Sequence, residues 1–272
     1  MMLSHPGSLL MLLNNTKALV TGASRGLGLA IVENFKNNGA VVVGSSITGI
    51  NNTLRSDVRN SVSMKNLVLH ATTIMGDINT LVCNAGIYGP IGPTETNNWD
   101  EWKTAIEINL YGVVSACRHV VPELKRKRSG KIIILSGGGA TKAMPNFSAY
   151  AASKAAVVRY AETLAEELRE YNIQVNCVAP GSMNTVFMET AITAGPNKTG
   201  QEFYDRMLKQ KEEGGDSIEN AAELIAFLAS NKSDHITGKL ISAVWDDWKN
   251  LDGKILEPNM YTLRRIDKES ML

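Results

Sequence analysis

Tyr150 and Lys154 lie four residues apart in Tyr-Ala-Ala-Ser-Lys, a spacing that suits proton transfer. Positions i and i+4 of a helix share one face, so the phenol and the ammonium can address a common substrate. A free phenol has a pKa of about 10 and keeps its proton at neutral pH. A neighbouring ammonium favours the phenolate, so we expect a pKa lowered toward the range of acid–base catalysis. An ordinary amphipathic helix edge has the same spacing.

A glycine-rich turn upstream predicts a dinucleotide site. Residues 17–28 run from an apolar strand into this turn and then into an amphipathic helix. The first glycine of such a turn permits a sharp strand exit, the second lets backbone approach a diphosphate, and the third lets the helix pack closely on the strand. Amides at the helix N-terminus face the phosphates. A generic strand-to-helix turn is the alternative. The expected cofactor contacts are Gly22, Ser24, Arg25, Gly26, Leu27 and Gly28.

Short β-branched runs alternate with longer helical patterns, which is typical of parallel strands joined by helical crossovers. The runs are almost continuously hydrophobic, so helices must cover both sheet faces. We expect an α/β fold, a doubly wound, Rossmann-like three-layer sandwich with a central parallel sheet of about seven strands. The expected strands are 18–21, 41–45, 80–83, 132–135, 174–178 and 240–243. The expected helices are 26–37, 60–75, 97–127 (with or without a break), 149–171, 200–213 and 217–230.

The order and spacing of these motifs, with Asn84-Ala85-Gly86 and Pro180-Gly181, resemble the classical short-chain dehydrogenase/reductase family. The resemblance covers about residues 15 to 245. It implies an NAD(P)(H)-dependent oxidoreductase that interconverts a carbonyl and a secondary alcohol by hydride transfer, with Tyr150 as general acid and base. It also implies that Lys154 binds the nicotinamide ribose.

The same resemblance makes Asn109 the active-site asparagine, which holds a water that connects the lysine to solvent. An asparagine inside a helical pattern competes with the backbone, and this local misfit favours a functional role. The segments after the strands at 80–83 and 174–178 are expected against the ribose and the nicotinamide. Plain turns, and a helix cap at Thr185, are the alternatives. These residues are Asn84, Ala85, Gly86, Pro180, Gly181, Met183 and Thr185.

The catalytic serine is the one departure inside the core motifs. In the family it lies 13 residues before the tyrosine, a count that ends on Gly137, whereas Ser136 lies 14 before. We expect Ser136 to bind the substrate oxygen, with a one-residue shift in the glycine loop that follows. Thr141 and Ser148 are weaker candidates, and a Ser136 that only caps its strand is the alternative.

The end of the second strand bears on the choice of cofactor. An acidic residue there usually binds the ribose hydroxyls, but this chain has Ser45 and Ser46. With no carboxylate to repel a 2′-phosphate and with the Arg25 guanidinium nearby, NADP(H) is favoured over NAD(H). Asp57 and Val58 are expected to hold the adenine, with a helix N-cap as the alternative for Asp57. Residues 46–56 are too few and too polar for a crossover helix, so a loop and an open adenosine side are expected.

Composition narrows the ligand class. A net charge of +1 and a charged fraction of 20% argue against nucleic acid or an anionic membrane, so a small molecule is the expected partner. Cys83, Cys117 and Cys177 are widely separated in apolar stretches, which indicates reduced core residues, no metal site and a cytoplasmic location. The apolar run at 9–13 lacks a basic leader and is shorter than the roughly 20 residues that span a bilayer.

We divide the chain into an N-terminal extension (1–13), a single domain (14–250) whose residues 186–215 cover the substrate, and a C-terminal tail (251–272). The ending around Trp245 and Trp248 differs from the family's Val-Asp-Gly-Gly. It resembles tails on relatives encoded with surface-polysaccharide enzymes, which implies a sugar or nucleotide-sugar substrate. The two tryptophans are expected at a subunit interface or over the pocket.

Self-association is expected because relatives commonly pair their two long helices, 102–127 and 149–171 here, into a four-helix bundle. This implies a homodimer or homotetramer. The apolar positions that could form the contact, or could face the sheet instead, are Val113, Val114, Val121, Val157 and Leu164.

Two other function classes fit the same residues. A non-catalytic nucleotide-binding sensor or scaffold would bind cofactor without turnover, and Gly137 at the serine position favours it. An epimerase or dehydratase would use Tyr150 with no net redox turnover. Enoyl reduction is disfavoured because that branch of the family spaces its tyrosine and lysine more widely.

Overall fold

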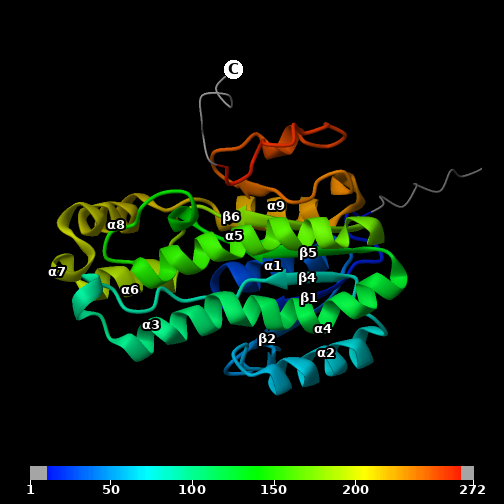
Figure 1. Cartoon of the computed structure of the whole chain (residues 1–272), viewed down its shortest axis with the longest axis horizontal. Coiled ribbons are helices and arrows are strands. Elements are labelled where there is room, and N and C mark those ends of the chain that lie inside the picture. Colours follow the sequence, from blue (N-terminus) through cyan, green and yellow to red (C-terminus); the bar gives the residue numbers. More distant parts are fainter. Residues whose placement is uncertain (1–10, 265–272) are drawn as a thin grey trace, which may run out of the picture.

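The computed structural model describes residues 11–264, and these form one parallel sheet with helices on both faces (Figure 1). The strand order is β3-β2-β1-β4-β5-β6-β7, so the expected doubly wound sandwich of seven strands is confirmed. The strands are β1 Lys17–Thr21, β2 Val41–Ser46, β3 Leu54–Arg55, β4 Thr80–Cys83, β5 Gly130–Leu135, β6 Ile173–Ala179 and β7 Leu240–Ser242.

The helices agree with the expected ranges except over residues 186–199, where two further helices appear. The stretch expected at 97–127 is one helical path whose middle, Glu107–Tyr111, is a π-turn. The α-helices are α1 Gly26–Asn37, α2 Ser61–Met75, α3 Trp99–Ile106, α4 Gly112–Lys127, α5 Ser148–Leu168, α6 Val186–Ala194, α7 Pro196–Thr199, α8 Gln201–Glu213 and α9 Ile218–Ala229.

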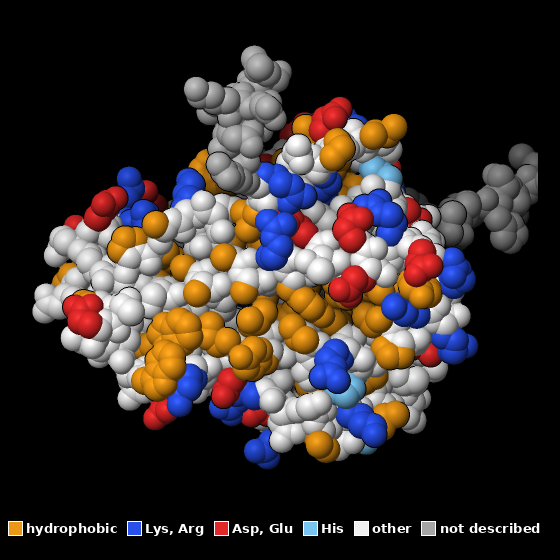
Figure 2. All heavy atoms as spheres, in the orientation of Figure 1, with side chains coloured by type: hydrophobic (Ala, Val, Ile, Leu, Met, Phe, Trp, Pro, Cys, Tyr) orange, Lys and Arg blue, Asp and Glu red, His pale blue; other side chains and the backbone are white. Residues whose placement is uncertain are grey.

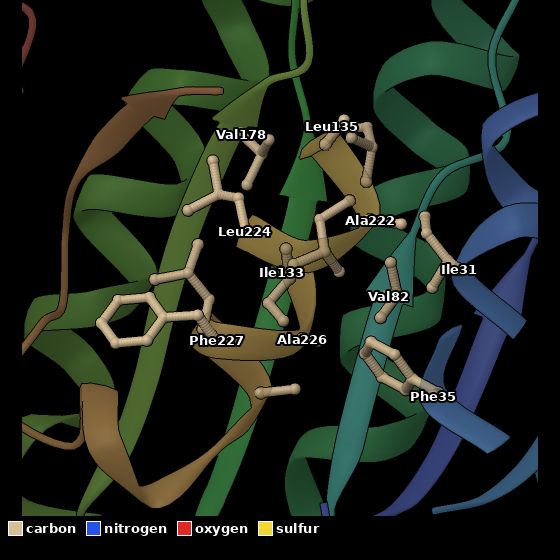
Figure 3. Close-up of a cluster of buried hydrophobic side chains, with 14 of the residues drawn as sticks. Ile31, Phe35, Val82, Ile133, Leu135, Val178, Ala222, Leu224, Ala226 and Phe227 are labelled. Atoms are coloured by element: carbon tan, nitrogen blue, oxygen red, sulfur yellow. The ribbon is translucent and has the colours of Figure 1, made fainter. Parts of the chain in front are cut away.

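Alternate residues of each strand enter different cores because strand side chains point to opposite faces. Ile133 and Leu135 of β5 pack toward α1 and α9, as Figure 3 shows. Ile132 and Ile134 pack toward α2, α4 and α5. Because both faces are covered, the functional groups must lie at the carboxyl ends of the strands.

No helix forms between β2 and β3, as expected from the short polar connection. The Ser46 hydroxyl lies 2.7 Å from the Thr53 hydroxyl and 3.4 Å from that of Thr48, and it accepts a hydrogen bond from the Gly49 amide at 2.9 Å. Asn51 donates to the Ser24 carbonyl at 2.7 Å. The loop is therefore folded back onto the glycine-rich turn.

Both ends of the described chain pack on the domain. Leu13, which we placed in the N-terminal extension, is fully buried in the core beside α1. Lys239 donates from its ammonium to the carbonyls of Glu257, Pro258 and Met260, each at 2.9 Å. The rest of the proposed extension and tail, 1–10 and 265–272, lies outside the described residues.

The two tryptophans of the ending behave differently. Trp248 is buried against Phe227 of α9, with ring centroids 6.1 Å apart, so it belongs to the core. Trp245 is 86% exposed. Trp248 is thus a core residue of the described part of the chain. It lines neither a pocket nor an exposed surface that could contact another subunit.

Three of the five positions expected at a helical interface face the sheet instead. Val113, Val157 and Leu164 are buried in the core under α4 and α5, because the apolar stripe of each helix serves the sheet first. Val114 and Val121 are half-buried on the outer side.

Cys83, Cys117 and Cys177 are free thiols in the core. Among the described residues, no group of His, Cys, Asp and Glu side chains could hold a metal ion. No helix in this part of the chain has the length and apolarity needed to cross a membrane.

Candidate active site and cofactor cradle

Tyr150 and Lys154 lie on one face of α5, near its N-terminus and above the end of β5. The Lys154 ammonium donates to the Leu135 carbonyl at 2.7 Å and lies 5.7 Å from the centroid of the Tyr150 ring. Lys154 is only 4% exposed, whereas Tyr150 is half-buried. The structure thus brings the predicted pair together and turns both groups toward the strand ends.

Burial, not the charge of the neighbour, controls the acidity of this pair. Desolvation, followed by the influence of Tyr88, raises the pKa of Tyr150. Desolvation lowers the pKa of Lys154 to about 8. The expected lowering of the phenol's pKa is wrong for this state of the protein, because both groups lose water and the ammonium is bonded to a carbonyl. Tyr150 holds its proton at neutral pH.

Asn109 sits in the π-turn, with its side chain fully buried. Its amide accepts from the Ile87 N–H at 2.9 Å, donates to the Ile87 carbonyl at 2.8 Å and donates to Ser153 at 2.9 Å. The π-turn, a feature frequent at functional sites, therefore ties α5 to the segment after β4. A Cβ built on Gly86 would lie 3.3 Å from the Asn109 oxygen and 3.5 Å from the Lys154 ammonium, so a side chain there would press on the Asn109 amide.

Gly137, not Ser136, faces the Tyr150 hydroxyl. A Cβ built on Gly137 would overlap the phenol oxygen of Tyr150. Ser136 is 3% exposed, and its hydroxyl donates to the Lys154 carbonyl at 3.3 Å. The one-residue loop shift that would carry Ser136 toward the substrate does not occur, because its amide continues the β5–β6 ladder by donating to Val178.

Neither alternative hydroxyl replaces the serine. Ser148 accepts a hydrogen bond from the Trp102 indole N–H at 3.1 Å. Thr141 is exposed on the loop before α5. The described residues near Tyr150 thus offer no serine or threonine hydroxyl directed at its phenol.

The glycine-rich turn has the shape that a diphosphate requires. A Cβ on Gly28 would overlap the Gly22 carbonyl, and a Cβ on Gly22 would lie 2.8 Å from the Ala85 Cα. Gly26 has a φ of +53° and faces Thr185 across a gap, with 3.6 Å from its built Cβ to the threonine methyl. The first turn of α1 has no acidic residue and no side-chain cap, so its amides are open to an anion. The residues present fit a bound dinucleotide.

Asn84 braces this turn from β4. Its side-chain amide donates to the carbonyls of Thr21 at 3.1 Å and Gly22 at 2.9 Å. On the opposite side, Gly181 has a φ of +97°, and the next amide, of Ser182, donates to Asp216 at 2.6 Å. Besides these, the structure places Ala85, Pro180 and Met183, which are half-buried, at the ends of β4 and β6, and Leu27, buried, in α1.

On the adenosine side, two of the expected contacts, Ser46 and Asp57, are bonded to other residues of the protein. Ser46 uses its hydroxyl to hold the loop, whereas the buried Ser45 hydroxyl has no partner. Asp57 binds the Arg59 guanidinium through both oxygens, and this contact lowers the pKa of its carboxyl group. Asn60, not Asp57, caps α2. Arg25 is exposed at the start of α1, and Val58 is half-buried after β3.

Four aromatic residues gather beside Tyr150. Phe187 and Phe203 fall in the segment 186–215 that we expected over the substrate, whereas Tyr88 and Phe147 were not assigned to the site. The Tyr88 ring contacts Tyr150, Phe147 and Phe187, at centroid distances of 4.9, 5.0 and 4.7 Å. Phe203 of α8 lies 4.7 Å from Phe147. The sequence contains a signal for this aromatic cluster, since three of the chain's five phenylalanines are Phe147, Phe187 and Phe203.

Comparison with known proteins places this architecture among oxidoreductases. The family described as enoyl-(acyl carrier protein) reductase matches residues 22–243. The 3-oxoacyl-[acyl-carrier-protein] reductase FabG of Staphylococcus epidermidis is 33% identical over 251 residues, covering 84% of this chain and 96% of that protein. Dehydrogenase/reductase SDR family member 4 of Sus scrofa is 30% identical over 244 residues, covering 84% and 86%. The ligand-free aldohexose dehydrogenase of Thermoplasma acidophilum matches with a TM-score of 0.75 at 30% identity, covering 85% and 92%.

Proposed function

Because the chain belongs to the classical short-chain dehydrogenase/reductase family, we propose that it is an NAD(P)(H)-dependent oxidoreductase that interconverts a carbonyl and a secondary alcohol. The observation that carries the proposal is the meeting of Tyr150, Lys154 and Asn109 beside the glycine cradle. Tyr150, Lys154 and Asn109 supply a proton donor, a cation and a polar brace at the strand ends, where α/β folds bind ligands.

Tyr150 is the general acid in reduction. When bound, the nicotinamide cofactor supplies the hydride for the carbonyl carbon. Tyr150 gives its proton to the carbonyl oxygen as the C=O double bond becomes a C–O single bond, and Lys154 stabilises the phenolate that remains. Asn109 holds α5 against the segment after β4 and keeps the pair in place. With Gly137 at the serine position, Tyr150 is the one hydroxyl that we assign to the substrate oxygen.

A cofactor-turnover screen tests the proposal. We expect a change in cofactor absorbance with at least one member of a panel of ketones, hydroxysteroids, sugars and nucleotide-sugars, offered with NADPH and with NADH. Cofactor binding without turnover of any substrate would support the sensor or scaffold alternative. Substrate conversion without a net absorbance change would support an epimerase or dehydratase.

We propose NADP(H) as the preferred cofactor, with Arg25 as the contact to the 2′-phosphate. Arg25 is exposed beside the α1 N-terminus, and the nearby strand end carries serines in place of a carboxylate. Replacing Arg25 with alanine should weaken NADPH binding about tenfold, the value of one charge-assisted contact, without changing NADH binding. Fluorescence titration measures both. Lys36→Ala, an exposed cation at the other end of α1, is the control; equal losses for both cofactors would contradict the assignment.

The pKa of Lys154 predicts an alkaline limit to reduction. The ammonium is charged below its pKa of about 8 and neutral above it, and only the charged form supports a phenolate at Tyr150. The kcat/KM for reduction should therefore be level near neutral pH and fall about tenfold per pH unit above pH 8. Lys154→Arg, which stays charged, should move this fall to higher pH. An unchanged profile in that variant would exclude Lys154 as its cause.

We also propose that the protein self-associates through the outer sides of α4 and α5, as a homodimer or homotetramer. Figure 2 shows hydrophobic side chains gathered over these helices. Tyr111, which is 59% exposed, and the half-buried Val114 and Val121 belong to this face. A cytoplasmic location suits the three buried free thiols.

A further inference from the structure

Aromatic rings from four separate segments form a wall beside the Tyr150 ring, which Tyr88 and Phe187 contact directly. Tyr88 follows β4, Phe147 precedes α5, Phe187 lies on α6 and Phe203 lies on α8. Tyr88 meets Tyr150 edge to face, with an interplanar angle of 77°, and meets Phe187 at 81°. The Phe187 ring centroid lies 6.0 Å from that of Tyr150. The general acid is thus bordered by ring faces and edges.

One side of this wall is buried in the protein, and the other side is accessible to solvent. Phe147 is fully buried, whereas Tyr88, Phe187 and Phe203 are half-buried. Behind them lies a separate apolar cluster under α6 and α8, which does not merge with the two cores of the sheet. Its buried members are Met188, Ala191 and Met207.

The polar groups at the rings are the Tyr88 hydroxyl and Arg206, whose guanidinium carbon lies 4.9 Å from the Phe203 ring centroid. Gly137 presents no side chain beside the Tyr150 hydroxyl, and the hydroxyls of Ser136 and Ser148 are bonded within the protein. A sugar placed here would leave several of its hydroxyl groups without partners, which is unfavourable in a desolvated site. A flat ring would instead make the edge-to-face contacts that Tyr88 and Phe187 already make with each other.

We propose that the substrate is a carbonyl compound whose carbonyl is attached to an aromatic ring, with that ring packed against Tyr88 and Phe187. The inference rests on the proposed function for the chemistry at Tyr150, but it makes its own claim about binding. As the substrate, it favours an aryl ketone over the sugar or nucleotide-sugar that the C-terminal ending suggested.

The test compares three carbonyl compounds with NADPH: 2-acetylnaphthalene, butan-2-one and D-fructose. We expect kcat/KM to be at least about tenfold higher for 2-acetylnaphthalene than for the other two. Tyr88→Leu and Phe187→Leu keep apolar bulk but remove a ring, and each should raise KM for 2-acetylnaphthalene about tenfold. In Phe187→Leu, whose ring is not among the causes of the Tyr150 pKa shift, kcat should stay within about twofold. Tyr171→Leu is the control, because Tyr171 lies roughly 30 Å away at the other end of α5.

Several results would overturn the inference. They are equal kcat/KM for butan-2-one or D-fructose, or unchanged KM in both ring variants. Calorimetry with 2-acetylnaphthalene on the NADPH-loaded protein separates binding from chemistry. Binding that the ring variants weaken, without turnover of any carbonyl, would support the aromatic site and reject the proposed reaction. Absence of binding to the wild-type protein would reject the aromatic site itself.

Discussion

Tyr150→Phe is expected to lower kcat on the order of 10³-fold while leaving NADPH binding unchanged. The substitution removes one oxygen and keeps the ring, so the contact with Tyr88 remains. The developing alkoxide then has no proton donor, and Gly137 offers no second hydroxyl in its place. Initial rates from cofactor absorbance and a fluorescence titration of NADPH measure the two quantities separately.

Tyr160→Phe is the matched control for this change. Tyr160 lies on the same helix, about three turns further on, and packs against the core beneath α5. Its loss of a hydroxyl should leave kcat within about twofold. A Tyr150→Phe enzyme that retained more than about a tenth of the wild-type rate would show that another group donates the proton.

Gly137→Ala is expected to lower kcat about 100-fold. A methyl group at this position would overlap the Tyr150 hydroxyl, so the Tyr150 ring must shift from its present position. A displacement of about 1 Å in a catalytic group can cost about 100-fold in rate. The glycine cradle is not touched, so the NADPH dissociation constant should not change. Steady-state kinetics and a thermal unfolding curve measure activity and stability.

Gly138→Ala provides the control at the next residue. A Cβ built on Gly138 has no other atom within 4 Å, so alanine fits there without displacement. We expect wild-type activity in this variant. Full activity in Gly137→Ala would mean that Tyr150 tolerates a neighbouring side chain. Glycine would then not be required beside the phenol.

Motifs that are local in sequence were predictable because local geometry determines them. The turn at 22–28 needs glycine where backbone must approach backbone, and it opens α1 at the expected residue. Tyr150 and Lys154 share a face for the same reason, since helical periodicity alone places them. β3 escaped detection because it has only two residues, Leu54 and Arg55, and neither is β-branched.

Features that depend on tertiary contacts could not be predicted in this way. Which of Ser136 and Gly137 faces the phenol depends on the register of β5 against β6, which a count along the chain does not contain. The direction of the pKa shift at Tyr150 depends first on burial and second on the electrostatic influence of Tyr88, which lies 62 positions earlier in the chain. The aromatic wall joins residues separated by up to 115 positions, from Tyr88 to Phe203.

The last strand of the sheet has no unused outward amide for a neighbour to join. Leu240 donates to the Tyr261 carbonyl at 2.7 Å, and Ser242 donates to the Asp246 carboxylate at 2.7 Å. Exposed strand edges otherwise invite pairing between chains, and the polypeptide that follows β7 occupies this one. A second copy of the protein could pair with this edge only after displacing the segment that supplies the Tyr261 carbonyl, which favours the helix-to-helix assembly proposed above.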